Sequence, residues 1–179
     1  DCQQNSTAKI GLEALITSTD GKTAPIAYSG SLSLSNPSFN AEFRLGPTTL
    51  NGSTVTGIVG WTLNYGLTIE TEYTDGAIWP VVCYITRATP TIDLKFRNQA
   101  YLNTYGPLFA TQTAAVVSCQ RKAAGGTVTA LASSAHITAS FADGIMSVED
   151  MGASGTNVME PTLRLYGQAL TIATAQALA

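Results

Sequence analysis

The clearest pattern in the sequence is the stretch WTLNYGLTIETE, which runs from Trp61 to Glu72. Apolar side chains occupy every second position from residue 61 to residue 69, and small or polar residues occupy the positions between them. Because successive side chains of a β-strand point to opposite faces, this alternation predicts one long strand with an apolar and a polar face. Gly66 is the position where the strand is expected to bend.

The two faces of this strand are expected to have different roles. The apolar face should pack into the protein core, and its members are Trp61, Leu63, Leu67 and Ile69. Leu67→Asp should then abolish folding, because burying an unpaired charge is costly. The polar face consists of Thr62, Asn64, Thr68, Glu70 and Glu72.

Short β-type segments and frequent turn signals fill most of the remaining chain. Asp-Gly, Asn-Gly and similar pairs predict turns at residues 20–21, 29–30, 51–52, 75–76, 125–126 and 143–144. Further strands are expected at residues 10–16, 28–34, 81–86, 91–96, 113–121, 127–131, 136–141, 145–148 and 162–172. Residues 36–49 are interpreted as an extended loop or an irregular strand, and residues 173–179 as an Ala-rich tail that orders only on a partner.

Only the segment from residue 98 to residue 110 has a helical character. Ala100, Leu102 and Tyr105 have approximately helical spacing, Asn98 can cap the first turn, and a Gly-Pro pair at 106–107 would end the helix. The sequence therefore predicts a mainly β fold, a β-sandwich or rolled barrel with one short flanking α-helix. A length of 179 residues fits a single domain spanning residues 1–179.

The composition is poor in charge for a globular protein. Hydrophobic residues make up 45% of the chain, charged residues only 12%, and the net charge is −3. A surface of small polar residues suits a protein whose faces are covered by neighbouring copies, although a Thr-rich extracellular β domain is an alternative. The absence of a Lys or Arg cluster disfavours tight nucleic-acid binding. The longest apolar run, residues 77–85, is too short to span a bilayer, so no membrane insertion is expected.

No motif for catalysis is apparent. The one histidine, His136, alternates with Thr138 and Ser140 and is expected on the polar face of a strand. No nucleophile elbow or phosphate-binding loop occurs. Glu70 and Glu72 share a face, as a glycosidase would need, but nothing marks a sugar pocket. The chain is therefore interpreted as a non-enzyme with no catalytic, cofactor-binding or metal-binding residues.

Metal and redox chemistry are equally weakly indicated. The three cysteines, Cys2, Cys83 and Cys119, match no metal or redox spacing, and their odd number favours a reducing compartment over a disulfide framework. Cys83 and Cys119 are interpreted as small buried hydrophobic residues. A cation near Glu149 and Asp150 stays an open alternative, because carboxylates are calcium ligands.

The order of the parts resembles a known family. After the strand ending in ETEY (70–73) come PVVCYIT (80–86), RATPTIDLKF (87–96) and the predicted helix. Then follow a Gly-Gly pair at 125–126, HITASF (136–141), DGI (143–145) and PTLRLYG (161–167). Over residues 50–175 this order resembles the tail tube (major tail) proteins of long-tailed bacteriophages and related injection machines. Residues 1–49 match less clearly and are interpreted as an arm or an insertion.

The resemblance implies a virion protein that is assembled in the host cytoplasm. It implies that six copies close a ring and that rings stack into a hollow tube. It further implies passage of DNA as non-specific cargo and contacts with a tape measure protein and other tail proteins. A bore for DNA should be neutral or acidic, so the polar face from Thr62 to Glu72 is the candidate lumen surface, and Glu70→Gln should leave assembly intact.

Three other classes remain open from the sequence. The chain could be an extracellular β-sandwich module for binding or adhesion. It could also be another virion part, such as a tail terminator, a distal tail protein or a capsid decoration protein. An enzyme, a glycosidase or a peptidase, is the third class, and the lone histidine argues against it.

Overall fold

The computed structural model describes residues 1–4, 6–11, 13–26, 41–97, 110–123, 126–150 and 160–178. The chain divides into two compact units. The first, called here the sheet unit, comprises Asp1–Ile10, Phe39–Tyr65 and Thr89–Ala179. The second, called the hairpin unit, comprises Gly11–Ser38 and Gly66–Ala88. The fold is all-β in the described residues, as the sequence predicts, and a single domain over residues 1–179 stays a prediction.

In its described residues, the sheet unit forms one antiparallel sheet of ten strands. Its strands are β1 (Cys2–Gln3), β2 (Ala41–Leu45), β3 (Thr48–Leu50), β4 (Ser53–Val55), β5 (Ile58–Asn64), β8 (Thr91–Phe96), β9 (Ala110–Ala123), β10 (His136–Asp150), β11 (Thr162–Gly167) and β12 (Leu170–Gln176). They follow the order β1-β5-β8-β11-β10-β9-β3-β4, with β12 also on β10 and β2 also on β9. Strands β1 and β4 lie at the two ends of this order and do not pair with each other. The described sheet is therefore open and does not close into a barrel.

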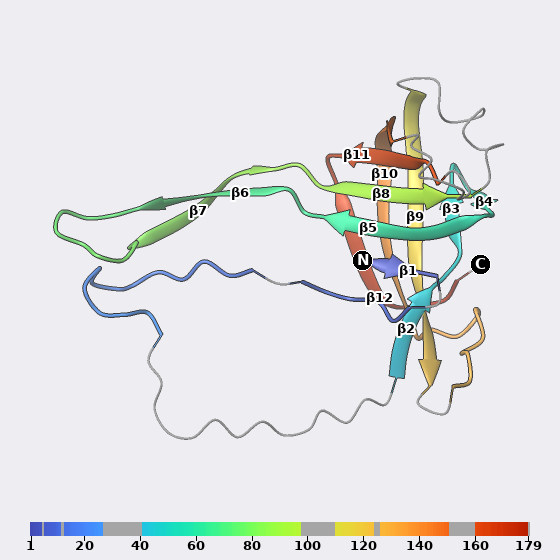
Figure 1. Ribbon diagram of the computed structural model, residues 1–179, viewed down its shortest axis with the longest axis horizontal. Coiled ribbons are helices and arrows are strands. Elements are labelled where there is room, and N and C mark those ends of the chain that lie inside the picture. The colour runs from blue at the N-terminus through green and yellow to red at the C-terminus, as the bar shows by residue number, and fades with distance from the viewer. Residues whose placement is uncertain are drawn as a thin grey trace. The chain divides into compact units, whose positions relative to one another are not determined.

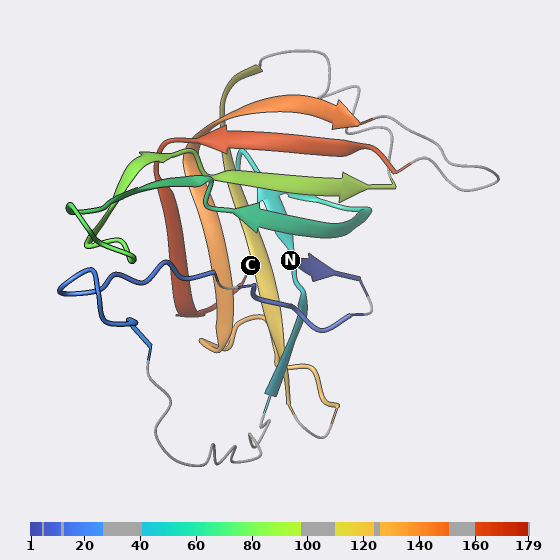
Figure 2. The same ribbon diagram turned by 60° about the vertical axis from the view of Figure 1, so that its left-hand side comes forward.

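The sheet folds over on itself at β10. The first half of this strand pairs with β12 and the second half with β11, while β9 pairs along its other edge. As a result β5, β8 and β11 form a layer that runs across β9, β10 and β12 (Figures 1 and 2). Two layers that cross in this way enclose a core between their inner faces.

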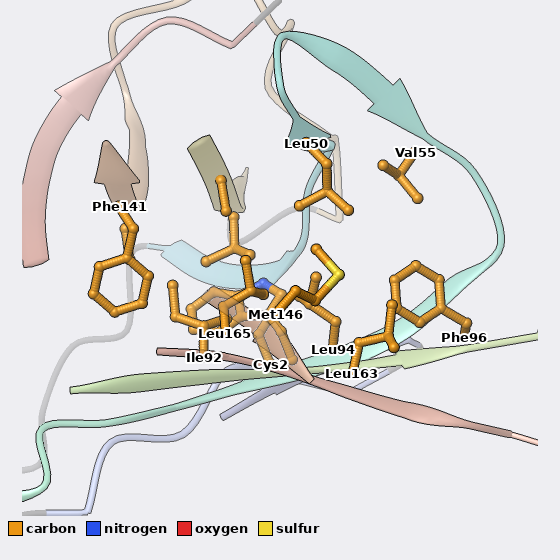
Figure 3. Close-up of a cluster of buried hydrophobic side chains, with 14 of the residues drawn as sticks. Cys2, Leu50, Val55, Ile92, Leu94, Phe96, Phe141, Met146, Leu163 and Leu165 are labelled. Carbon is orange, nitrogen blue, oxygen red and sulfur yellow. The ribbon is translucent and has the colours of Figure 1, made fainter. Parts of the chain in front are cut away.

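The core of the sheet unit follows from strict alternation. Ile92, Leu94 and Phe96 on β8 are fully buried, as are Leu163 and Leu165 on β11. The crossing layer and the β3–β4 hairpin contribute Phe141, Met146, Val117, Leu50 and Val55, most of which Figure 3 shows gathered around the β8 and β11 side chains. Each large apolar side chain buried here contributes about 1.5–3 kcal/mol.

The hairpin unit contains the strands β6 (Leu67–Glu72) and β7 (Val82–Ala88), which pair antiparallel. The prediction of one continuous strand over residues 61–72 is wrong, because β5 ends at Asn64 and β6 begins at Leu67. Gly66 between them has φ +56°, a left-handed conformation that interrupts an extended strand. The prediction that Leu67 and Ile69 belong to the core is also wrong, because they are 47% and 36% exposed.

Several other predicted elements are confirmed. The strands at 81–86 and 91–96 correspond to β7 and β8, and the strand at 113–121 lies within β9. The predicted turn at residues 51–52 joins β3 to β4, with φ of +49° at Asn51 and +76° at Gly52. These values match the two-residue hairpin turn for which the Asn-Gly pair is typical.

Other predicted elements need correction. Residues 136–150 form one strand, because β-bulges around Phe141 and Gly144 absorb the Asp-Gly pair that predicted a turn. No strand forms in the described part of residues 10–16, and residues 127–131 contribute only an isolated bridge. Residues 173–176 belong to β12 and pair with β10, so they are no unpaired tail. The strand predicted at 28–34 and the helix predicted at 98–110 lie outside the described residues, apart from Ala110, which begins β9.

Candidate functional site

The predicted lumen surface is divided between the two units. Thr62 and Asn64 lie on β5 of the sheet unit, whereas Thr68, Glu70 and Glu72 lie on β6 of the hairpin unit. All five side chains are exposed. Of the predicted core residues, Trp61 is buried in the sheet unit and Leu63 is half-buried.

A polar ladder crosses the outer face of the sheet unit. Thr62, Asp93, Arg164 and Ser147 stand opposite one another in register on β5, β8, β11 and β10. They alternate with the core residues, so they lie on the face that points away from the core. Thr62 donates a hydrogen bond to Asp1, which extends the ladder to the chain's first residue.

Arg164 is the centre of this ladder. Its guanidinium binds Asp93 through two hydrogen bonds, from Nε at 2.6 Å and from Nη2 at 2.8 Å, and it also donates to Glu149 at 3.2 Å. The hydrogen bonds to Asp93 raise the pKa of Arg164 above its ordinary value. Two parallel bonds to one carboxylate fix the geometry of both side chains, so the ladder is rigid at this point.

Glu149 joins the ladder from β10. Its carboxylate accepts hydrogen bonds from Ser147 at 2.7 Å and from Tyr166 at 2.8 Å. These bonds, together with the charge of Arg164, lower the pKa of Glu149 below its ordinary value. The sequence reasoning missed Asp93 and Arg164, although their positions between buried residues of β8 and β11 could have placed them on this face.

The acidic residues of the hairpin unit have a different setting. Tyr84 on β7 stands opposite Glu70 on β6 and donates a hydrogen bond of 3.2 Å to its carboxylate. This bond is the largest cause that raises the pKa of Tyr84. Neither Glu70 nor Glu72 is among the acids of the described salt bridges, and both point into solvent.

The hairpin unit also exposes a large amount of apolar surface. Its exposed hydrophobic side chains in the described residues are Leu15, Ile16, Ile26, Leu67, Ile69, Tyr73, Ile78, Trp79, Val82, Tyr84 and Ile85. Leu15, Ile69, Cys83 and Ile85 line an open depression of about 330 Å³. The described residues of this unit form only the two-stranded sheet β6–β7, and two strands alone are marginal in water. An apolar surface of this extent is typical of an interaction surface.

The end of the hairpin is held by a loop from residues 18–23. Backbone amides of Ile78 and Trp79 donate to the carbonyl of Gly21, at 2.8 and 3.0 Å, and the Ser18 amide donates to Pro80. Gly21 has φ +68°, and a Cβ there would lie 2.6 Å from Ala77 Cβ, so only glycine fits. Asp20 accepts hydrogen bonds from Thr23, Lys22 and Ser18, which lower the pKa of its carboxyl.

His136 does not lie on a polar face, which corrects the prediction. It is fully buried in the sheet unit. Its Nδ1 accepts the backbone N–H of Arg121 at 3.1 Å, so Nε2 carries the proton and donates to the carbonyl of Ala130 at 2.9 Å. The ring therefore connects β9, β10 and the intervening loop, and this role is structural.

No group of three His, Cys, Asp or Glu side chains lies close enough to hold a metal ion within the residues described. The carboxylate of Glu149 accepts hydrogen bonds within the ladder, and the carboxylate of Glu160 forms a salt bridge with Arg97 at 2.8 Å. Within the same residues no helix is of the length and apolarity needed to cross a membrane.

Comparisons with known proteins identify no family. A scan against protein-family models finds no match, and neither does a search of curated proteins. Among solved structures, the chain is similar to one in the cryo-EM structure of the anti-feeding prophage (AFP) baseplate, 6-fold symmetrised. The TM-score is 0.38 and the identity 10%, over 81% of this chain and 99% of that chain. A similarity at this level is too distant to assign a function.

Proposed function

We propose that this protein is a non-enzymatic structural subunit that assembles with copies of itself in a phage-like tail or a related injection machine. The observation that carries this proposal is the apolar surface of the hairpin unit. In the isolated chain its side chains, such as Ile78 and Ile85, stay 73% and 58% exposed. Covering them with another copy removes this surface from water, which is the main favourable term in protein association.

The low charge of the chain supports the same role. Only 12% of the residues are charged, and apolar contact surfaces are typically depleted of charge. Contacts between a hairpin of one copy and a different surface of the next are heterologous, so they produce rings or open filaments. A self-assembling subunit of this kind needs no catalytic group.

Within this role we place the protein in a tail tube, as six-membered rings that stack around a bore. Glu70 and Glu72 are exposed acids, and with Thr62, Asn64 and Thr68 they suit a bore that does not grip DNA. DNA would then be non-specific cargo, and a tape measure protein and other tail proteins would be partners. The protein would reside in the virion, or in the corresponding injection particle.

The oligomeric state of matched variants tests this proposal. Ile85→Asp places a charge in the hairpin surface, and Ile145→Asp places one at a 52% exposed site on β10 of the sheet unit. We expect wild-type protein and Ile145→Asp to form rings or tubes, and Ile85→Asp to remain a folded monomer. Light scattering after size-exclusion chromatography gives the mass, and negative-stain images give the ring symmetry.

The same measurement separates the alternatives. A wild-type protein that stays monomeric at high concentration contradicts self-assembly and favours a β-sandwich binding module. Rings with a symmetry other than six would keep the structural role and reject the tail-tube arrangement.

A further inference from the structure

Two of the three cysteines meet inside the sheet unit. Cys2 on β1 is 1% exposed and Cys119 on β9 is 5% exposed, and both belong to the same hydrophobic core. They are 117 positions apart in the sequence, and their thiols lie near enough for each to shift the pKa of the other. Both are free thiols in this structure, whereas the third, Cys83, lies in the hairpin unit.

The surrounding strands bring Cys2 close to Cys119. Cys2 stands opposite Trp61 in the pairing of β1 with β5. The indole N–H of Trp61 donates to the carbonyl of Ser118 at 3.3 Å, which holds the β1–β5 pair against the residue before Cys119. Cys2 and Cys119 therefore face the same part of the core between the two layers.

We propose that Cys2 and Cys119 are a redox-sensitive pair whose disulfide fastens strand β1 to strand β9. Strand β1 is the part of the sheet that such a link would change most. It has two residues, it pairs only with β5 among the described strands, and it lies at the edge of the sheet. A short edge strand opens more readily than a central one, so it gives an oxidant access to the buried thiols.

The chemistry requires a small disulfide, such as oxidised glutathione, as the oxidant. The thiolate of Cys119 attacks one sulfur of that disulfide, which forms a mixed disulfide at Cys119 and releases one thiol. The thiolate of Cys2 then attacks the Cys119 sulfur and releases the second thiol, so two protein thiols are oxidised and one small disulfide is reduced. The neighbouring Cys2 thiol lowers the pKa of Cys119, which favours Cys119 as the first nucleophile, and the neighbouring Cys119 thiol raises the pKa of Cys2.

The link would stabilise the folded chain. A disulfide that closes a loop of more than a hundred residues constrains the unfolded chain strongly, and for a protein of this size we expect Tm to rise by about 10 °C.

The sequence does not predict this pair, because an odd number of cysteines with irregular spacing does not reveal which two meet in the fold. The inference is independent of self-assembly.

The test uses the full chain incubated with oxidised glutathione and then alkylated and mapped by mass spectrometry. We expect alkylatable thiols to fall from three to one per chain, with the Cys2 and Cys119 peptides linked and Cys83 free. Reductant should reverse both the link and the rise in Tm. Cys83→Ser should behave like wild type, and Cys2→Ser should fold but show neither the link nor the rise.

Each other result overturns the proposal. One such result is three thiols that remain alkylatable after oxidation of the wild-type chain. Others are glutathione retained on Cys119 without a link to Cys2, or a disulfide that includes Cys83. Because mapping is done on wild-type protein, the outcome does not depend on whether a variant folds.

Discussion

The sheet unit and the hairpin unit use the same local pattern with opposite results. Strand β8 alternates apolar and polar residues, and its Ile92 and Leu94 are 0% exposed. Strand β6 alternates in the same way, yet its Leu67 and Ile69 remain in solvent. The difference is the second layer, because β9 and β10 cover the apolar face of β8 whereas the hairpin unit has only two described strands.

This contrast shows that alternation defines an apolar face but not what covers it. In the sheet unit the cover comes from strands elsewhere in the same chain. In the hairpin unit a second copy of the chain is our proposed cover. Substitutions in the sheet unit should therefore act on folding, and substitutions in the hairpin unit should act on assembly.

The sharpest test of the contrast replaces one leucine in each unit. Leu94→Asp should abolish folding, because an unpaired carboxylate in the core costs an amount comparable to the whole stability of a domain, about 5–15 kcal/mol. Leu67→Asp, which the sequence predicts to be equally damaging, should leave the fold intact and weaken assembly. Circular dichroism with thermal melts measures the first effect, and light scattering measures the second.

Leu94→Met and Leu67→Met serve as controls, since they keep apolar surface and volume. If Leu67→Asp also prevented folding, the hairpin would be part of the folding core, and the division into two roles would be wrong.

A second, smaller effect is expected at His136. The variant His136→Leu removes the partners of the Arg121 N–H and the Ala130 carbonyl, and both of these hydrogen bonds are part-buried. A fully buried group left without a partner costs about 1–3 kcal/mol and a part-buried one costs less, so a total of about 2 kcal/mol is expected. Urea unfolding measures the change. His136→Asn, which keeps a donor and an acceptor, should lose less, and equal losses for both variants would argue that ring packing dominates.

His136 also illustrates what the sequence can and cannot predict. The strands at 91–96 and 136–141 follow from local alternation, as does the turn at Asn51-Gly52, because each depends on residues that are neighbours in the chain. The burial of His136 depends on a loop that returns over β9, and no local pattern encodes that return. The division of the predicted strand into β5 and β6 likewise depends on one backbone conformation, at Gly66.

A third comparison concerns one polar pair in each unit. Arg164→Met removes two hydrogen bonds from the half-buried carboxylate of Asp93, and about 1–2 kcal/mol of stability should be lost. Tyr84→Phe removes the hydrogen bond to Glu70 at the exposed face of the hairpin, and the unfolding midpoint should not change measurably. Chemical denaturation of both variants and of wild type measures the change in stability. An equal loss of stability in both variants would contradict the view that the hairpin contributes little to folding.

The smallest effect expected is a pH dependence that arises in the sheet unit. The pKa of Glu149 is lowered in the folded chain from its ordinary value of 4.5, by the hydrogen bonds from Ser147 and Tyr166 and by Arg164. A carboxyl group with a lowered folded pKa stabilises the fold above its unfolded pKa, and this contribution is lost as the pH falls below about 4.5. Wild-type protein should therefore lose more stability between about pH 7 and pH 3 than Glu149→Gln does. Tyr166→Phe, which keeps the carboxylate but removes one donor, should lie between them in urea unfolding. Identical pH profiles for all three proteins would mean that the ladder does not hold Glu149 in its charged form.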